Sequence, residues 1–191
     1  MQESSKTQQE RIAKFKSIMA PCFPYIIHPE TVDALVDLGF FVAPASIHHH
    51  GQYEGALFDH SFEVTKALVN LTERLGLTWL RLESPLIVGM FHDLCKVDNY
   101  KSSVSPLGDT SRGDEWEYNN AVLLPGHSEK SVIMVHQFFP LTLEEILCIR
   151  WHMGAFDSKE NWNNYGRSVT EYPNVLYTHT ADMIAARIVG V

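Results

Sequence analysis

The sequence predicts one all-α domain, a bundle of about seven helices that spans residues 1–191. Two observations carry this prediction. Residues 60–75 place apolar side chains at i, i+4, i+7 and i+11, which is the spacing of one helix face. The alternation that is typical of a half-buried strand is found only near 115–118, and neither a repeat nor a linker divides the 191 residues.

Four helices are expected in the first half of the chain. Residues 8–20 have an amphipathic period that ends at two prolines, and a short helix follows Pro29. Residues 39–55, rich in Pro, Ser, Gly and His, are expected to form a loop before the helix over 60–75. A helix that starts at Ser84 and Pro85 is apolar all round, so we expect it to be central and buried and to end at His92 and Asp93.

Residues 98–124 interrupt the helical pattern. They are rich in Ser, Gly, Asp and Asn, and Glu115–Tyr118 alternates aromatic and acidic residues as a strand does. We interpret the segment as an irregular excursion over the surface that contains a small hairpin and is a candidate lid.

Helices are expected to resume after Gly126. Residues 127–139 carry a helical period, and Thr142 begins another helix through a capping box with Glu145. Residues 161–168 are interpreted as a polar, aromatic loop, and 173–189 as the last helix.

Composition and charge exclude several classes of protein. With a net charge of −8, the chain lacks the excess of basic residues that is typical of a protein that binds duplex DNA or a membrane surface. The three cysteines are far apart, so a disulfide framework is not expected and a reducing compartment is favoured. Residues 1–10 lack the apolar stretch of a secretory signal, and 85–91 is too short to cross a bilayer, which takes ~20 residues. We therefore expect a cytoplasmic protein.

Histidine is the unusual component of this sequence, with ten residues. Several stand at or near predicted helix ends, where side chains from different helices can point into one bundle core. The candidate metal ligands are four histidines and two aspartates: His60, His92, Asp93, His127, His152 and Asp182. Such a set suits a pair of divalent transition metals, Fe, Mn, Co, Ni or Zn. Two metals ~3.5–4 Å apart can stabilise the attacking and leaving oxygens of a phosphoryl transfer, and Asp93 is placed to bridge them.

Two lysines are candidate substrate contacts. Lys96 follows Asp93 by three residues, so on a helix both side chains share a face, and Lys96 could hold a substrate phosphate at the metals. Lys130 has the same relation to His127. We therefore predict Asp93 and Lys96 as catalytic residues, and Lys96 and Lys130 as substrate-binding residues.

Other residues near the candidates have an ordinary structural interpretation. Cys95 is expected to be a core thiol, because the sequence gives it no partner base. His179 lies one turn before Asp182, and a supporting hydrogen bond or simple packing is expected there rather than metal ligation.

Five segments, in order, carry a resemblance to a known family. They are GALFDHSFEV (55–64), GMFHDLCKVDNY (89–100), LPGHSEKSV (124–132), IRWHMG (149–154) and YTHTADMIAARI (177–188). This order of H, HD, H, H and D in a helical chain resembles the HD-domain superfamily of metal-dependent phosphohydrolases. The resemblance implies an HD-domain helical bundle and covers about 42–188.

The resemblance also implies roles for individual residues. One metal would be held by His60, His92, Asp93 and Asp182, and Asp93 would bridge to a second metal. That second metal would be held by His127 and His152, and Lys96 matches a lysine that contacts phosphate in many members. The stretch 43–60 is similar to the approach to the HD domain of YhaM-type 3′→5′ exoribonucleases, which makes His50 a candidate substrate contact. The chain resembles the HD part of those enzymes and not their OB-type domain.

The expected function is hydrolysis of a phosphoester of a small, nucleotide-like substrate, and an RNA 3′ end is among the candidates. Neither duplex DNA nor a membrane is an expected partner. Two alternatives stay open, a di-iron HD-type oxygenase and a non-catalytic nucleotide-binding regulator. The presence of Lys96 favours phosphate chemistry over oxygen chemistry, and the complete ligand set argues against a regulator.

Overall fold

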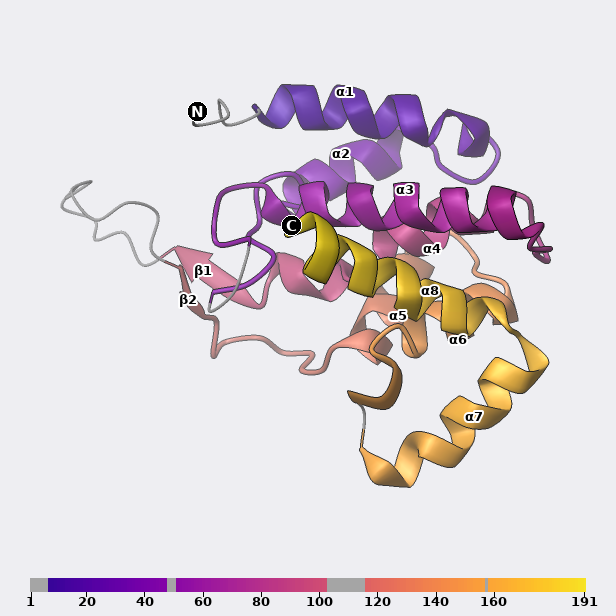
Figure 1. Cartoon of the computed structure of the whole chain (residues 1–191). Coiled ribbons are helices and arrows are strands. Elements are labelled where there is room, and N and C mark those ends of the chain that lie inside the picture. The colour runs from indigo at the N-terminus through magenta and orange to yellow at the C-terminus, as the bar shows by residue number, and fades with distance from the viewer. Residues whose placement is uncertain (1–6, 48–50, 103–115, 157) are drawn as a thin grey trace, which may run out of the picture.

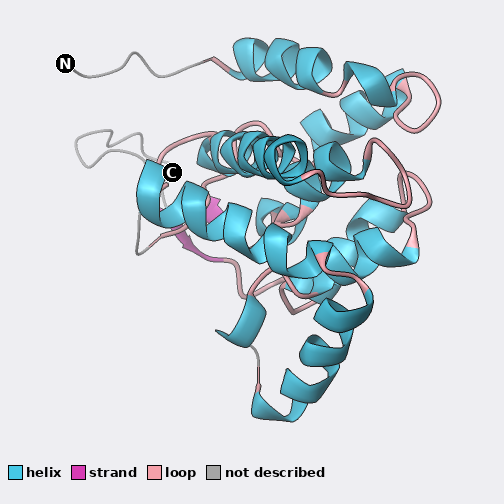
Figure 2. Ribbon diagram, turned by 45° about the vertical axis from the view of Figure 1, so that its right-hand side comes forward, coloured by secondary structure: helices cyan, strands magenta, loops and turns pink. Residues whose placement is uncertain are grey.

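The computed structural model describes residues 7–47, 51–102, 116–156 and 158–191. Within these residues the chain forms eight α-helices and one two-stranded sheet, which confirms the predicted all-α fold with a small hairpin (Figure 1, Figure 2). The helices are α1 Gln8–Ile18, α2 Pro29–Asp37, α3 Ala56–Leu75, α4 Ser84–Phe91, α5 Ser128–His136, α6 Leu143–Arg150, α7 Trp162–Glu171 and α8 Asn174–Met183, and the strands are β1 Tyr100–Ser102 and β2 Trp116–Tyr118.

The centre of the fold is the contact between α3 and α4. Helix α4 is buried along most of its length, as its uninterrupted apolar sequence predicts. Gly89 allows the close approach, because a Cβ atom at this position would lie 2.6 Å from the Cα atom of Thr65 on α3. The two helices therefore meet nearly backbone to backbone, which fixes the residues that follow α4 relative to α3.

Aromatic side chains join the N-terminal helices to this centre. The rings of Phe15, Phe40, Phe41, Phe58 and Phe91 form contacts with centroid distances of 5.2–6.2 Å. In Figure 1, α1 and α2 accordingly lie on the side of α3 that is opposite α7.

Buried carboxylates tie helix ends together. Glu145 forms the predicted capping box with Thr142 at the start of α6, and it also accepts hydrogen bonds from Arg81 and Ser84 at the start of α4. Asp59 in α3 forms an ion pair of 3.2 Å with Arg11 of α1. These contacts hold α1, α4 and α6 in fixed positions around α3.

The hairpin falls inside the predicted excursion. Strands β1 and β2 pair antiparallel with Tyr100 opposite Tyr118, and the two rings lie 5.6 Å apart. The segment 103–115 lies outside the described residues, so the predicted lid has no structural account.

The predicted loop over 161–168 is wrong, because these residues belong mostly to α7. Its polar composition hides a helical spacing of Trp162, Tyr165 and Val169 at i, i+3 and i+7. Tyr165 and Val169 pack against the core, and the ring of Tyr165 lies 6.0 Å from that of Trp151. A narrow apolar stripe thus stabilises a helix whose other faces are exposed.

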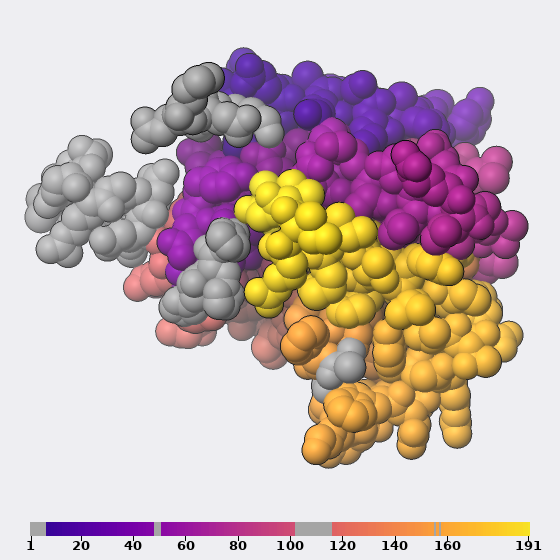
Figure 3. Space-filling view, viewed as in Figure 1, coloured from indigo at the N-terminus to yellow at the C-terminus, as the bar shows by residue number. Residues whose placement is uncertain are grey.

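The last predicted helix, 173–189, corresponds to α8 and a π-helical turn, Ile184–Val189. Both elements contact α3, and the space-filling view shows this C-terminal segment on the surface beside α3 (Figure 3). No helix among the described residues is long and apolar enough to span a membrane.

Candidate metal centre

Side chains from five helices converge at one end of the α3–α4 contact. Helix α3 begins at Ala56, four residues before the predicted start, so that His60 lies within its first turns. The other candidate ligands stand at the end of α4, the start of α5, the end of α6 and the last turn of α8. All six predicted ligands come together here: His60, His92, Asp93, His127, His152 and Asp182.

Backbone oxygens orient three of the four imidazoles. Nδ1 lies 2.9 Å from the Gly89 oxygen in His92, 2.7 Å from the Ile149 oxygen in His152 and 3.0 Å from the Val191 oxygen in His60. A neutral imidazole that donates Nδ1–H to a carbonyl presents the lone pair of Nε2, which is the form that binds a metal.

The four Nε2 atoms form two pairs. Those of His60 and His92 lie 3.3 Å apart, and those of His127 and His152 lie 3.2 Å apart. Two imidazole lone pairs at this distance repel each other unless a proton or a cation lies between them. Each pair is therefore a position suited to positive charge.

Asp93 stands between the two pairs. Its Oδ2 atom lies 3.7 and 3.5 Å from the Nε2 atoms of His60 and His92, and its Oδ1 atom lies 3.1 and 3.4 Å from those of His127 and His152. The residue is 3% exposed, and Oδ1 has no hydrogen-bond partner of ordinary geometry within the described chain. One oxygen of this carboxylate thus faces each imidazole pair.

The centre is divided into two groups of donors. Asp182 joins the first, with its Oδ1 atom 3.2 Å from Nε2 of His60 and 3.9 Å from Nε2 of His92. We call His60, His92, Asp182 and Oδ2 of Asp93 the first group. His127, His152 and Oδ1 of Asp93 form the second group.

Positive charge stabilises the ionised form of Asp93. Burial raises the pKa of this carboxyl. The opposing effect of Lys96, His92 and His127 is larger, so the pKa lies well below its usual range. The Nζ atom of Lys96 lies 2.7 Å from Oδ2. Burial lowers the pKa of His127, yet Asp93 and Cys95 outweigh it and raise that pKa to about 10. For His152, by contrast, burial dominates and lowers the pKa.

These donors could hold metal ions. Donor atoms of His60, His92 and Asp93 all lie within 4.8 Å of one another, as do those of Asp93, Cys95 and His127. Imidazole and carboxylate donors suit Fe, Mn, Co, Ni or Zn, and a cation at each group would compensate the buried Asp93 charge and relieve the repulsion within the imidazole pairs.

A cavity of about 620 Å³ opens onto the first group. It is lined by Ala45, Ser46, His60, Asp93, Lys96, Tyr100, Met153, Asp182, Met183, Ala186, Arg187 and Val191. Two cations, Lys96 and Arg187, thus share one cavity with two carboxylates. Arg187 was not predicted, because a residue five positions after Asp182 would lie on another face of a regular α-helix. The wider π-helical turn brings it to the same cavity.

The other predicted substrate contacts have different outcomes. Lys130 does not line this cavity; it is 1% exposed, forms an ion pair with Asp98 and donates to Oδ1 of Asn99 at 3.0 Å. Its positive charge is therefore compensated by Asp98 within the fold. His50 lies outside the described residues.

Two neighbours of the centre take part in its hydrogen bonding. Nδ1 of His179 lies 2.7 Å from the backbone oxygen of His152, which agrees with the expected supporting role. Cys95 is fully buried, as expected for a core thiol, and its Sγ atom also lies 3.3 Å from Nδ1 of His127, a base partner that the sequence did not predict. That partner is 32 residues away in sequence, and no local pattern reveals it.

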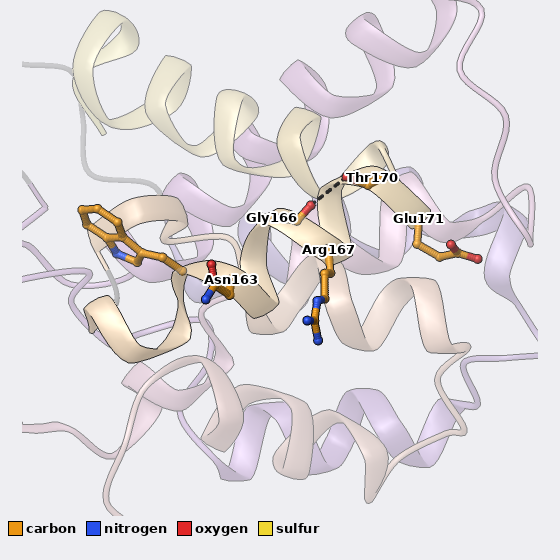
Figure 4. Close-up of a pocket in the computed structure, with 6 residues that line it drawn as sticks. Asn163, Gly166, Arg167, Thr170 and Glu171 are labelled. Carbon is orange, nitrogen blue, oxygen red and sulfur yellow. Dashed lines mark hydrogen bonds between the residues drawn. The ribbon is translucent and has the colours of Figure 1, made fainter.

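A larger hollow, of about 840 Å³, follows α7 (Figure 4). Its lining comes from this helix alone and includes Arg167 and Glu171, and the hydroxyl of Thr170 donates to the Gly166 oxygen at 2.9 Å. None of the six candidate ligands lines it, so the cavity beside Asp93 is the candidate functional site.

Comparison with known proteins adds no assignment, because no family model, curated protein or solved structure matches this chain. The resemblance to HD-domain proteins therefore stays a prediction from five sequence segments.

Proposed function

We propose that this chain is a metal-dependent phosphohydrolase of the HD type that acts on a phosphoester of a nucleotide-like substrate. One observation carries the proposal: each oxygen of the buried Asp93 faces its own pair of imidazole Nε2 atoms. We assign one divalent transition metal to the first group and another to the second, with Asp93 as the shared ligand.

The two metals would supply Lewis acidity at phosphorus and an activated water. Residues of the chain would orient the ligands and bind the substrate. The backbone carbonyls hold the imidazoles in their ligating tautomer, and Asp93 keeps the two groups in register. Lys96, whose Nζ atom lies beside Asp93 and lines the cavity, is placed to hold a phosphate oxygen and to counter charge that develops there.

The cavity supports a small substrate. Its volume of about 620 Å³ is in the range of small-molecule sites, and Arg187 adds a second cation for a phosphorylated ligand. Tyr100, Met153 and Met183 offer aromatic and apolar surface that suits a nucleoside. The net charge of −8 disfavours duplex DNA.

The test combines metal analysis with a substrate screen. The protein is loaded with Mn, Fe, Co, Ni or Zn, and hydrolysis of nucleoside monophosphates, cyclic nucleotides and short RNA is measured. We expect about two metals per chain and hydrolysis of at least one phosphoester. Asp93→Asn, which keeps the shape and removes the charge, is expected to lose both metals and activity. His136→Gln, which changes an exposed histidine outside the centre, serves as the control.

Other outcomes point to the alternatives. Retention of two metals by Asp93→Asn would contradict the bridging assignment. Oxygen uptake by the iron-loaded protein, without hydrolysis of any phosphoester, would favour the di-iron oxygenase. Nucleotide binding without turnover would favour the regulator.

A further inference from the structure

One imidazole of the centre is oriented differently from the other three. Nδ1 of His60, His92 and His152 contacts a backbone oxygen in each case. Nδ1 of His127 instead lies 3.3 Å from the Sγ atom of Cys95. A side chain, which a point mutation can remove, thus stands where the other histidines use the backbone.

Cys95 is held firmly in this position. The residue is fully buried in the 3-10 turn Leu94–Val97, directly after Asp93. Its backbone N–H donates to the hydroxyl of Ser131 at 3.1 Å, and Ser131 belongs to α5, the helix that His127 precedes. The thiol and the imidazole are therefore fixed to the same helix and cannot move apart independently.

The direction of the hydrogen bond decides whether His127 can bind a metal. If the S–H group donated the hydrogen bond to Nδ1, the neutral ring would carry its proton on Nε2, and Nε2 could not bind a metal. If Nδ1–H donates to the sulfur, the lone pair of Nε2 faces Oδ1 of Asp93, 3.1 Å away. That oxygen belongs to a residue only 3% exposed and lies 3.1 and 3.4 Å from the Nε2 atoms of His127 and His152, which marks this side of Asp93 as a ligand position.

We propose that Cys95 is a positioning residue for the second group: its sulfur accepts Nδ1–H of His127 and so sets the affinity of the second metal. This inference rests on the proposed two-metal function. It adds that the two metal positions are unequal and that only the second depends on a thiol.

The two groups differ in ways that support unequal affinity. The first group has a second carboxylate, Asp182, and two buried imidazoles. The second group has Asp93 as its carboxylate, and the side chain of His127 is 34% exposed. The first metal is therefore expected to bind more tightly, and the second to be the exchangeable one.

The test measures the affinity of each metal by titrating Co²⁺ or Mn²⁺ into metal-free protein. Cys95→Val keeps an apolar side chain of similar size but removes the acceptor, so the second equivalent should bind about 10–100-fold more weakly while the first is unchanged. Cys95→Ser restores an acceptor and should recover most of the lost affinity. Cys148→Ala, which changes another buried cysteine outside the centre, should bind both metals as the unchanged protein does.

Each other result has a defined meaning. Unchanged affinity of both metals in Cys95→Val, confirmed as folded by its circular dichroism, would overturn this inference and leave the proposed function standing. Equal weakening in Cys95→Val and Cys95→Ser would indicate a purely steric role and would also overturn it. A sulfur-to-cobalt charge-transfer band in the unchanged protein would show that Cys95 ligates the metal directly, against a positioning role. Absence of metal binding by the unchanged protein would overturn both proposals.

Discussion

The position of Lys96 argues against one interpretation of that residue, a pair with a surface acid. A lysine paired with a surface acid contributes only about 0–1 kcal/mol, and Asp98 or Glu129 could have been the partner. In the structure Asp98 pairs with Lys130, and Glu129 pairs with Arg150. Lys96 instead contacts the buried carboxylate of Asp93 and lines the cavity, a position that supports the proposed contact with phosphate.

Lys96→Ala should therefore keep both metals and lower kcat for the best phosphoester about 10²–10³-fold, the loss that follows removal of one donor aimed at developing negative charge. Metal content and steady-state kinetics on the same sample provide the measurement. Lys101→Ala is the matched control, because Lys101 forms an exposed ion pair with Glu117 in the hairpin. A variant with full metal content and an unchanged rate would remove the main support for phosphate chemistry.

At the scale of elements, Gly89 couples the packing of α4 to the candidate metal centre. An added Cβ would meet the backbone and side chain of Thr65 at 2.6–2.9 Å, and the Gly89 oxygen orients His92. Gly89→Ala should therefore lower the free energy of unfolding by about 1–3 kcal/mol, as overpacked cores do, and also weaken metal binding. Urea denaturation and metal titration measure the two effects.

Helix α7 offers the opposite case for the same substitution. Nothing lies within 4 Å of a Cβ atom built at Gly166, which is in the middle of this helix. Gly166→Ala should raise the free energy of unfolding by up to about 1 kcal/mol, because alanine loses less backbone entropy on forming a helix. A loop over 161–168 would give no such gain, so the denaturation midpoint also tests the correction made to that segment.

At the scale of the whole molecule, bound metal should stabilise the fold, since the donors come from five helices. A ligand at 100 times its Kd adds about 2.7 kcal/mol per site, which is roughly 5–10 °C in Tm for a chain of this size. Differential scanning fluorimetry with and without a chelator measures the shift. An unchanged Tm at saturating metal would contradict a centre that joins these helices.

The metal-dependent shift should also grow with pH. The pKa of His127 is raised from 6.5 to about 10 in the fold, so its protonated form stabilises the metal-free protein fully below pH 6.5, and this contribution is lost as the pH rises toward 10. Metal competes with that proton and binds better as the pH rises. The difference in Tm between loaded and chelated protein is therefore expected to increase between about pH 6 and pH 9.

The sequence determined most of the helices of this protein. Helical spacing, paired prolines and the Thr142–Glu145 capping box are local signals, and they act before any tertiary contact is made. The sequence misled over 161–168, where a polar composition concealed the stripe formed by Tyr165 and Val169. That helix depends on burial against Trp151, which no window of adjacent residues contains.

The sequence also determined which residue types could meet at a metal centre, because ligands at helix ends can converge in a bundle. Only the tertiary structure decided how they meet. It assigned one oxygen of Asp93 to each imidazole pair, placed Cys95 against His127, brought Arg187 into the cavity and paired Lys130 with Asp98. The reason is physical. Periodicity specifies the face of a helix on which a side chain lies. Distances of 3–4 Å between side chains of different helices depend on how closely the helices pack, and Gly89 determines this closeness for α3 and α4.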